Sequence, residues 1–585
     1  MYLLLAPSPR GAAGTEPAVD ILRLDASGAA VATRTLLRTD LPLAVRELER
    51  ELEGELGQGR RPRWVWYKAQ GWYPDLLAAG VRVDRCHDVA LCRNILVHST
   101  FTAGTDYALT TAPLPLDDRP EPRPVMADQV SLFEELDQHP RSDGPEMAEL
   151  RQEFTAQLQS VRESTQPARL TLLLAAESAG ALIAAEMRHT GLPWRADLHE
   201  QILLRHLGPR PTGAQRPEKL EFLAGRLREE LKAPSLNPDS AQELVRALHR
   251  AGIETKTTRS WELEQISHPA IELLLAYKKI SRLHTANGWA WLDQWVAGGR
   301  FRPEYVVGGV VSGRWASRGG GALQIPRQIR AAAHADPGWK LIVADAAQLE
   351  PRVLAALAKD STMAEAARDK DLYAGIAAQG FGGDRAKAKA ALLGAMYGAT
   401  TGESGRLMGQ LAKSYPAAVG FVEAAARAGE RGEVVTSRLG RSCPAPSDQW
   451  LATQRSSTAE EQRRAESAAR SRGRFTRNFV VQGSAADWAA CWLAEVRRRL
   501  GALTAELAVP SAAGTADATP AHRKGPELVF FLHDEVMVHA PDELLDSVVQ
   551  VLEESSRAAT RLLFGNIPIA FPVNITVVDS YADAK

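Results

Sequence analysis

The 585-residue sequence is 45% hydrophobic and 24% charged, proportions that are ordinary for globular domains, and its formal net charge at pH 7 is −1. The length exceeds that of one domain of roughly 100 to 200 residues, so we expect a multidomain chain with α/β and α+β parts. The charge balance excludes a protein that binds nucleic acid through its total charge, so any such binding needs local basic surface.

The first residues and the cysteines indicate the compartment. The N-terminal run 1–5 has no basic flank and is broken by Pro7, so it predicts a first β-strand and no export signal. No apolar run approaches the length needed to cross a bilayer. Four cysteines are too few and too scattered for a disulfide framework or a zinc site. We therefore expect a cytoplasmic protein with no membrane partner.

The N-terminal part, residues 1–110, alternates short apolar runs with helical stretches, which predicts an α/β domain. Residues 111–152 are rich in proline and acidic residues, which predicts a linker. The clearest local signals of the first part are strands at Val19–Leu24, Trp64–Tyr67 and Val81–Val83 and a helix at Leu41–Leu56.

Residues 153–300 have a helical pattern, with long amphipathic segments at Leu170–His189 and Ile271–Trp295. Beyond Phe301, strands and helices mix. Two later stretches, 444–472 and 503–526, have the biased composition of surface excursions, and we expect loops or frayed helices there.

Two segments place carboxylates at strand ends. The first, Lys340–Asp345, is an apolar strand that ends in an acid and leads into a helical run at 353–358, with Pro351 suited to the first helical position. The second, Leu528–His539, predicts a hairpin whose turn holds His533, Asp534 and Glu535.

Asp345 and Asp534 suit metal-assisted phosphoryl transfer. This chemistry uses two divalent cations about 3.5 to 4 Å apart, bridged by hard oxygen ligands that two strands can supply. Mg²⁺ is the natural ion, because it keeps waters and substrate phosphates as its other ligands. The alternative is that each acid only caps a helix or lies in a turn, and for either segment alone that reading is favoured.

A third segment, 384–398, predicts a helix on which four residues recur every fourth position and form one face. The face is about 18 Å long, enough to extend from a triphosphate at its basic end to a base at its tyrosine end. The alternative is an ordinary amphipathic helix with two solvated cations. The four residues are Arg385, Lys389, Leu393 and Tyr397.

Together these segments resemble the motifs of family A DNA polymerases, the group of bacterial DNA polymerase I, over roughly residues 165–585. Motif A corresponds to 345–352, motif B to 385–398 and motif C to 533–535. Further matches lie at 237–244, 312–314 with 323–326, and 474–483. The resemblance implies a right-hand polymerase with palm, fingers and thumb, preceded by an RNase H-like exonuclease-type domain.

The resemblance also implies a division of the chain. Residues 1–110 are expected to form a degenerate 3′–5′ exonuclease-like domain, 111–152 a linker and 153–300 the thumb. Residues 301–361 are expected to form the first part of the palm, 362–470 the fingers and 471–585 the second part of the palm.

By this resemblance the chain adds dNTPs to a primer by two-metal transfer with Mg²⁺, for which Mn²⁺ can substitute. Asp345, Asp534 and the backbone carbonyl of Ala346 are expected to bind the metals, and Glu535 to support them. Arg385 and Lys389 are expected to bind the triphosphate, with Lys389 also catalytic. The remaining residues expected around the nucleotide are Gln348, Glu350, Leu393, Tyr397 and His533, the last at the primer end or the phosphates.

The DNA contacts are expected from Arg314, Arg474, Asn478 and Gln482. Minor-groove acceptors occupy similar places in every base pair, so contacts there test the shape of the pair without reading sequence. Glu350 resembles a steric gate that excludes the ribose 2′-hydroxyl, which argues against a single-subunit RNA polymerase.

Three departures from the family are visible. Ala346 and Ala347 replace Tyr-Ser, and a backbone carbonyl remains available. Leu393 replaces an aromatic residue, which predicts altered nucleotide affinity and discrimination against dideoxynucleotides. Residues 1–118 lack the metal-binding Asp-x-Glu and Tyr-x3-Asp of active proofreading domains, which predicts no 3′–5′ exonuclease activity. We also expect a short form without the 5′ nuclease domain.

The acidic linker contains a peptide, 128–133, that resembles the motif docking on the bacterial sliding clamp. Gln129, Leu132 and Phe133 are the expected contacts. The alternative is a short amphipathic helix that packs on a neighbouring domain.

The expected partners are thus primer–template DNA, dNTPs and the clamp, for a monomeric, nucleoid-associated enzyme of repair or gap filling. Arginines within 461–479 are expected to line the duplex. A polymerase-like scaffold without catalysis and a lesion-bypass polymerase remain as alternatives.

Overall fold

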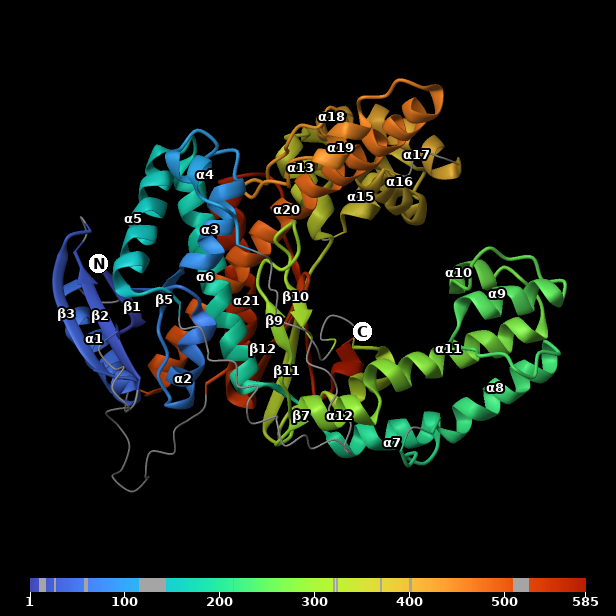
Figure 1. The fold of residues 1–585 in the computed structure, drawn as a ribbon, viewed down its shortest axis with the longest axis horizontal. Helices are drawn as coiled ribbons and strands as arrows, with labels where there is room; N and C mark the ends of the chain where they lie inside the picture. The colour runs from blue at the N-terminus through green and yellow to red at the C-terminus, as the bar shows by residue number, and fades with distance from the viewer. Residues whose placement is uncertain are drawn as a thin grey trace.

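The computed structural model has the mixed helix and sheet content expected from the sequence (Figure 1). The clamp peptide with Gln129, Leu132 and Phe133 lies outside the described residues, so its role stays a prediction. The described residues are 1–9, 17–25, 28–56, 61–114, 144–213, 215–318, 321, 325–368, 371–398, 402–508 and 525–584.

The N-terminal sheet has the strand order β3-β2-β1-β4-β5, in which β1, β2 and β3 are antiparallel and β1, β4 and β5 are parallel. The predicted strands at the N-terminus, at Val19–Leu24 and at Trp64 are confirmed. The strand predicted at Val81–Val83 is wrong. Val81 and Val83 are buried in a loop, and the strand follows at Arg85. The bounds are β1 Tyr2–Pro7, β2 Ala18–Leu24, β3 Ala30–Leu37, β4 Arg63–Trp66 and β5 Arg85–Asp88.

Helices cover both faces of this sheet. Helices α1 and α2 pack on one face, and α1 confirms the predicted helix. Helix α5 packs on the other face through Leu150 and Phe154. Most of α5 was expected to belong to a separate helical unit beginning at residue 153, and its apolar face instead completes the N-terminal core. The bounds are α1 Leu41–Leu56, α2 Tyr73–Ala78, α3 Val89–His98, α4 Asp106–Thr110 and α5 Met147–Glu163.

Helix α6 (Pro167–Thr190) lies between the N-terminal sheet and the central sheet (Figure 1). By length and composition it could cross a membrane, contrary to the expectation from sequence, but 67% of its most apolar window is buried inside the protein. Leu182 contributes to the N-terminal core and Leu173 to the central core. Its apolar character follows from packing on two sides.

A first helical arm, 196–295, projects from the central sheet, with α9 and α10 at its tip (Figure 1). It has a small core of its own that includes Leu248 and Leu274. The helix predicted at Ile271–Trp295 is interrupted at Gly288, where a Cβ would lie 2.2 Å from the carbonyl oxygen of His284. The bounds are α7 Ala196–Leu207, α8 Glu218–Glu230, α9 Ala241–Arg250, α10 Ser260–Leu263, α11 Pro269–Asn287 and α12 Trp289–Trp295.

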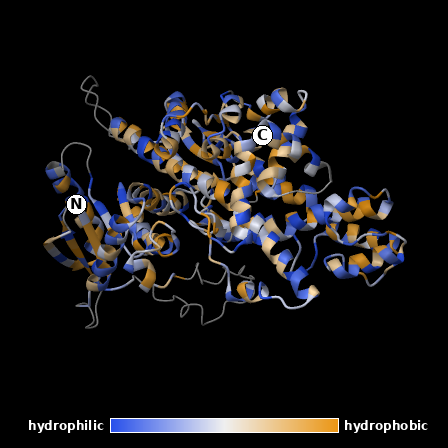
Figure 2. Cartoon of the chain, turned by 90° about the horizontal axis from the view of Figure 1, so that it is seen from above, coloured by the Kyte–Doolittle hydropathy of each residue, from blue (hydrophilic) through white to orange (hydrophobic). Residues whose placement is uncertain are grey.

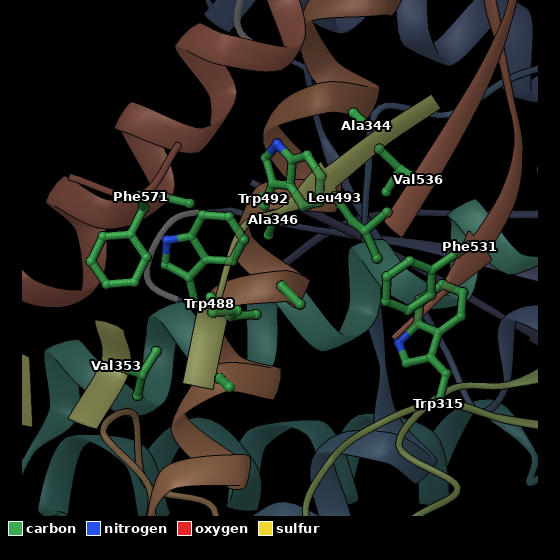
Figure 3. Packing of buried hydrophobic residues seen from close by; sticks show 14 of the residues in the cluster. Trp315, Ala344, Ala346, Val353, Trp488, Trp492, Leu493, Phe531, Val536 and Phe571 are labelled. Atoms are coloured by element: carbon green, nitrogen blue, oxygen red, sulfur yellow. The ribbon is translucent and has the colours of Figure 1, made fainter. Parts of the chain in front are cut away.

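The central sheet is antiparallel, in the order β12-β13-β11-β14. The predicted hairpin at Leu528–His539 is confirmed as β12 and β13. Trp488 stacks on Phe571 with ring centroids 5.7 Å apart, and its indole donates to Thr560 at 3.0 Å. Figure 3 shows Trp488 and Trp492 beside Ala346 of β11, so these aromatic rings pack against the central sheet. The bounds are β11 Trp339–Ala346, β12 Glu527–Leu532, β13 Glu535–Pro541, β14 Val573–Val578 and α21 Leu545–Phe564.

Short strands connect the first arm to the central sheet. Strands β6, β8 and β7 form one small sheet, and β9 and β10 form a hairpin. The turn of this hairpin carries Arg314, which donates to Glu350 just after β11. The bounds are β6 Leu192–Pro193, β7 Val296–Ala297, β8 Arg300–Phe301, β9 Glu304–Val306 and β10 Ala316–Arg318.

A second helical arm, 349–453, lies at the opposite end of the central sheet from the first, and both arms extend to the same side (Figure 1). Hydrophobic and hydrophilic stretches alternate along the helices, as expected of elements with one buried face (Figure 2). The bounds are α13 Leu349–Ala358, α14 Ser361–Ala366, α15 Leu372–Gly380, α16 Arg385–Tyr397, α17 Gly402–Ser414, α18 Pro416–Glu430 and α19 Asp448–Thr453.

Helix α20 (Ala459–Ala508) is 50 residues long and links the second arm to the central sheet. The expectation of loops or frayed helices at 444–472 is therefore wrong for α19 and for α20 from residue 459, and α20 also crosses the boundary predicted at 470. Contacts made within this stretch explain the order. The indole of Trp450 on α19 donates to the carbonyl of Ala468 on α20 at 3.3 Å. Arg472 of α20 donates to the carbonyl of Pro444 at 2.9 Å.

Candidate active site

The two predicted carboxylates meet where β11 and β13 pair. Asp345 lies directly opposite Glu535 in the antiparallel register, and the backbone N–H of Ala346 donates to the carbonyl of Asp534 at 2.8 Å. The turn between β12 and β13 puts His533 in the left-handed region, with φ of 58°. The fold therefore brings Asp345, Asp534 and Glu535 together at one end of the strand pair.

Glu535 differs from the two aspartates in its surroundings. Its side chain is buried, and Oε1 accepts a hydrogen bond of 2.6 Å from the hydroxyl of Tyr581. Burial and the charge of Glu535 raise the pKa of Tyr581 above its ordinary value. The phenol therefore stays protonated and keeps donating. Asp345 and Asp534 are only partly buried, so their position leaves them closer to solvent and to any substrate.

Asp345 and Asp534 fit a Mg²⁺ site whose remaining ligands come from the substrate and water. Within the described ranges, no three His, Cys, Asp or Glu side chains converge closely enough to hold a metal ion by themselves. Mg²⁺ is commonly bound by one or two carboxylates, with waters and substrate phosphates as the remaining ligands. Asp345 and Asp534 can supply that pair, and the fit requires a bound nucleotide.

Helix α16 presents the predicted face to solvent. Arg385, Lys389 and Tyr397 are exposed and Leu393 is half-buried, whereas Ala388, Leu392 and Ala395 on the opposite side are buried. Asp384 caps the helix by accepting from the N–H of Lys387 at 3.0 Å, and Gly398 ends it with φ of 76°. The four-residue spacing thus forms one accessible stripe.

Glu350, just after β11, contacts both the turn that carries Arg314 and helix α16. It is 9% exposed and accepts hydrogen bonds from Arg314 and, at 2.6 Å, from the hydroxyl of Tyr397. Burial and Glu350 raise the pKa of Tyr397, so this phenol remains a donor. Helix α13 begins at Leu349, two residues before the start predicted at Pro351. That earlier start places Glu350 in the first turn.

His533 lies close enough to Arg314 and Glu350 for their charges to affect its pKa. Burial lowers its pKa, and the charge of Arg314 lowers it further. A neutral imidazole is therefore favoured at neutral pH, and it can accept as well as donate a hydrogen bond.

Arg474, Asn478 and Gln482 follow one another at four-residue spacing along α20. A Cβ at Gly398, the end of α16, would lie 3.0 Å from the side chain of Arg474. A Cβ at Gly483 would lie 3.6 Å from the carbonyl oxygen of Ser312, next to the turn that carries Arg314. Helix α20, which carries three of the predicted DNA-contact residues, therefore lies against the end of α16 and against the turn that carries Arg314.

Sequence reasoning missed Asp371 and Tyr373, which lie beside this stripe. Asp371 caps α15 and accepts from Gln348 at 2.9 Å and from Arg385 at 2.7 Å. The guanidinium of Arg385 lies 5.6 Å from the ring centroid of Tyr373. An aspartate before an apolar helix is a recognisable N-cap signal. Nothing local indicates that it faces Arg385.

Most of the chain, including the candidate site, matches a known protein family. Residues 214–583 match the family model described as DNA polymerase family A. This match covers more than half of the chain and includes every residue of the carboxylate cluster, the α16 stripe and the α20 residues.

Curated relatives give weaker, partial matches. A thermostable DNA polymerase I of Thermus filiformis is 25% identical over 353 residues, which are 55% of this chain and 38% of that protein. A DNA polymerase I of Chloroflexus aurantiacus is 31% identical over 153 residues, 23% of this chain and 16% of that protein. The chain thus matches less than half the length of these relatives.

A solved structure resembles the whole chain. It is described as the POL domain of Pol1 from M. smegmatis in complex with DNA primer-template and dNTP. Its TM-score is 0.67 at 18% identity, covering 100% of this chain and 95% of that chain. At this identity the likeness concerns the fold alone.

Proposed function

This chain belongs to DNA polymerase family A, and from that membership we propose that it adds dNTPs to the 3′ end of a primer under the direction of a DNA template. The observation that carries the proposal is the register of β11 and β13, which puts Asp345 opposite Glu535 and bonds Ala346 to Asp534. Only pairing of the two strands in the folded sheet brings these acids together. A purely local role for each acid, as a helix cap or a turn residue, would not require them to meet.

In this proposal the central sheet is the palm, the first helical arm the thumb and the second helical arm the fingers. Arg385 and Lys389 bind the triphosphate, since both are exposed at the basic end of α16. Leu393 and Tyr397 lie further along α16, toward the base. His533 contacts the primer end or the phosphates.

The chemistry that two bound Mg²⁺ ions supply, or Mn²⁺ in their place, is activation of the primer hydroxyl and stabilisation of the leaving oxygen. Asp345 and Asp534 would hold these ions with the carbonyl of Ala346, and Glu535 would support the pair from its buried position. Arg314, Asn478 and Gln482 would contact the minor groove, and Arg474 would also contact the DNA.

Extension of a primed template with Mg²⁺ and dNTPs tests the proposal. Template-dependent addition of the complementary nucleotide supports it. Absence of addition by a folded chain that binds primer–template DNA would favour the alternative of a scaffold without catalysis.

We further propose a monomeric, nucleoid-associated enzyme of repair or gap filling, with lesion bypass as the alternative role. Copying of an undamaged single-nucleotide gap in preference to a lesion-containing template would distinguish the two.

We propose that the N-terminal domain, although built on a sheet with three parallel strands, does not proofread. Strand β1 has the sequence Tyr-Leu-Leu-Leu-Ala-Pro and carries no carboxylate that could bind a metal. A primer with a mismatched 3′ end should keep its length when incubated with Mg²⁺ and no dNTP. Pyrophosphatase is added so that reversal of polymerisation is not mistaken for exonuclease activity. Mg²⁺-dependent shortening under these conditions would contradict the proposal.

The linker peptide remains the basis for proposing the sliding clamp as a partner. Replacing Leu132 and Phe133 by alanine should weaken clamp binding by about tenfold or more, because two apolar anchors are lost. Affinity that does not change in a direct binding measurement would reject this partner.

A further inference from the structure

Asp371 is the centre of a network that joins three parts of the candidate site. Its Oδ1 accepts from Gln348 Nε2 at 2.9 Å and from the backbone N–H groups of Tyr373 and Ala374 at 3.0 and 3.2 Å. Its Oδ2 accepts from Arg385 Nε at 2.7 Å. Gln348 also accepts from the N–H of Leu372 at 2.8 Å, so both ends of its amide are bound to the start of α15.

The two carboxylate oxygens of Asp371 have different tasks. Oδ1 alone provides the helix cap, so capping does not require the contact from Oδ2 to Arg385. Burial raises the pKa of Asp371, but the hydrogen bonds from Arg385 and Gln348 outweigh it and hold the pKa below its usual value. The carboxylate is therefore an anion at neutral pH and a firm partner for a cation.

The geometry of the pair leaves Arg385 able to bind a second anion. Asp371 contacts Nε, and no hydrogen bond among the described residues uses the two terminal amino groups of Arg385. The ring of Tyr373 lies against the guanidinium. A side chain held by a carboxylate and a ring face loses less conformational freedom when a ligand binds.

We propose that Asp371 is a positioning residue that holds the Arg385 guanidinium in place for the triphosphate. Through Gln348 it ties this guanidinium to the segment that follows Asp345, so the phosphate-binding group and the metal-binding strand are placed by one network. The inference rests on the proposed function, because it assigns the triphosphate to Arg385.

The test is equilibrium binding of dGTP, with Mg²⁺, to the chain on a primer that ends in a dideoxynucleotide, so that binding is measured without chemistry. Asp371→Asn keeps the size of the side chain and an oxygen for the cap but removes the charge that faces Arg385. We expect its Kd for dGTP to rise about 2- to 10-fold. On an extendable primer, KM should rise similarly while kcat changes less than about twofold.

Glu433→Gln is the matched control. Glu433 is also a carboxylate of this arm that pairs with an arginine, Arg431 at 2.7 Å, but it is exposed and lies outside the candidate site. Its Kd for dGTP should stay at the native value. In an Arg385→Ala background, Asp371→Asn should have no further effect, which a purely structural role of Asp371 would not produce.

The outcomes separate this inference from the proposed function. If native chain extends primers and Asp371→Asn binds dGTP as well as or more tightly than native, the positioning role is overturned while the polymerase stands. If the effect persists in the Arg385→Ala background, Asp371 acts elsewhere and the role is also overturned. If native chain neither binds dGTP nor extends a primer, both conclusions fail.

Discussion

Replacing Asp345 or Asp534 by asparagine is expected to lower the rate of dNTP incorporation by about a thousandfold or more, because anionic ligands for the metals contribute several kcal/mol to transition-state stabilisation. The fold should survive, since both side chains are only partly buried and asparagine has the same shape. Single-nucleotide incorporation in Mg²⁺ measures the rate. Fluorescence anisotropy of labelled primer–template shows that DNA still binds.

A matched carboxylate elsewhere in the same sheet provides the control. Asp579 follows β14, is exposed and pairs with Lys340 at 2.7 Å, away from the strand end that carries Asp345. Asp579→Asn should incorporate dNTPs at the native rate. Loss of activity in this variant would indicate a general effect on the sheet. Activity of Asp345→Asn within tenfold of native would contradict its assignment as a metal ligand.

Glu350→Ala is expected to reduce the selectivity for dNTP over NTP by about 10- to 200-fold, the range that small changes of shape in a substrate pocket produce. The reason is that Glu350 is nearly buried and fixed by Arg314 and Tyr397, so its bulk cannot move aside for a 2′-hydroxyl. The measurement is the ratio of kcat/KM for dGTP and GTP on the same primed template.

Glu350→Gln separates bulk from charge. Glutamine keeps the size and an oxygen that can accept from Tyr397, but it loses the ion pair with Arg314. Selectivity should stay within about threefold of native if bulk is what excludes the ribose. If Glu350→Gln loses as much selectivity as Glu350→Ala, the ion pair is decisive and the steric explanation is wrong. Melting temperatures of both variants exclude unfolding as the cause.

The sequence was sufficient for elements whose pattern lies within a short window. Helix α1 and the β12–β13 hairpin appear where the periodicity predicts them, because local propensity and burial agree there. The sequence also predicted that Asp345 and Asp534 lie at strand ends and that Arg385 lies on a helix face, and the structure places them there. Their roles stay predictions.

The errors arose where burial had a distant cause. Val81 and Val83 are apolar because a loop is buried, and α6 is apolar because it packs between two cores. Helix α20 extends into a stretch of low-complexity composition because Trp450 on α19 and the carbonyl of Pro444 supply partners for Ala468 and Arg472. None of these partners is near in sequence.

Only the tertiary structure decided how the parts of the site meet. Strand register placed Asp345 opposite Glu535, and a hairpin turn brought Arg314 to Glu350. Asp371 could be recognised from sequence as a helix cap, but its contact with Arg385 depends on how α15 and α16 pack. The physical reason is that hydrogen-bonding periodicity and helix capping act over a few residues, whereas register and packing are set by contacts between segments far apart in the chain.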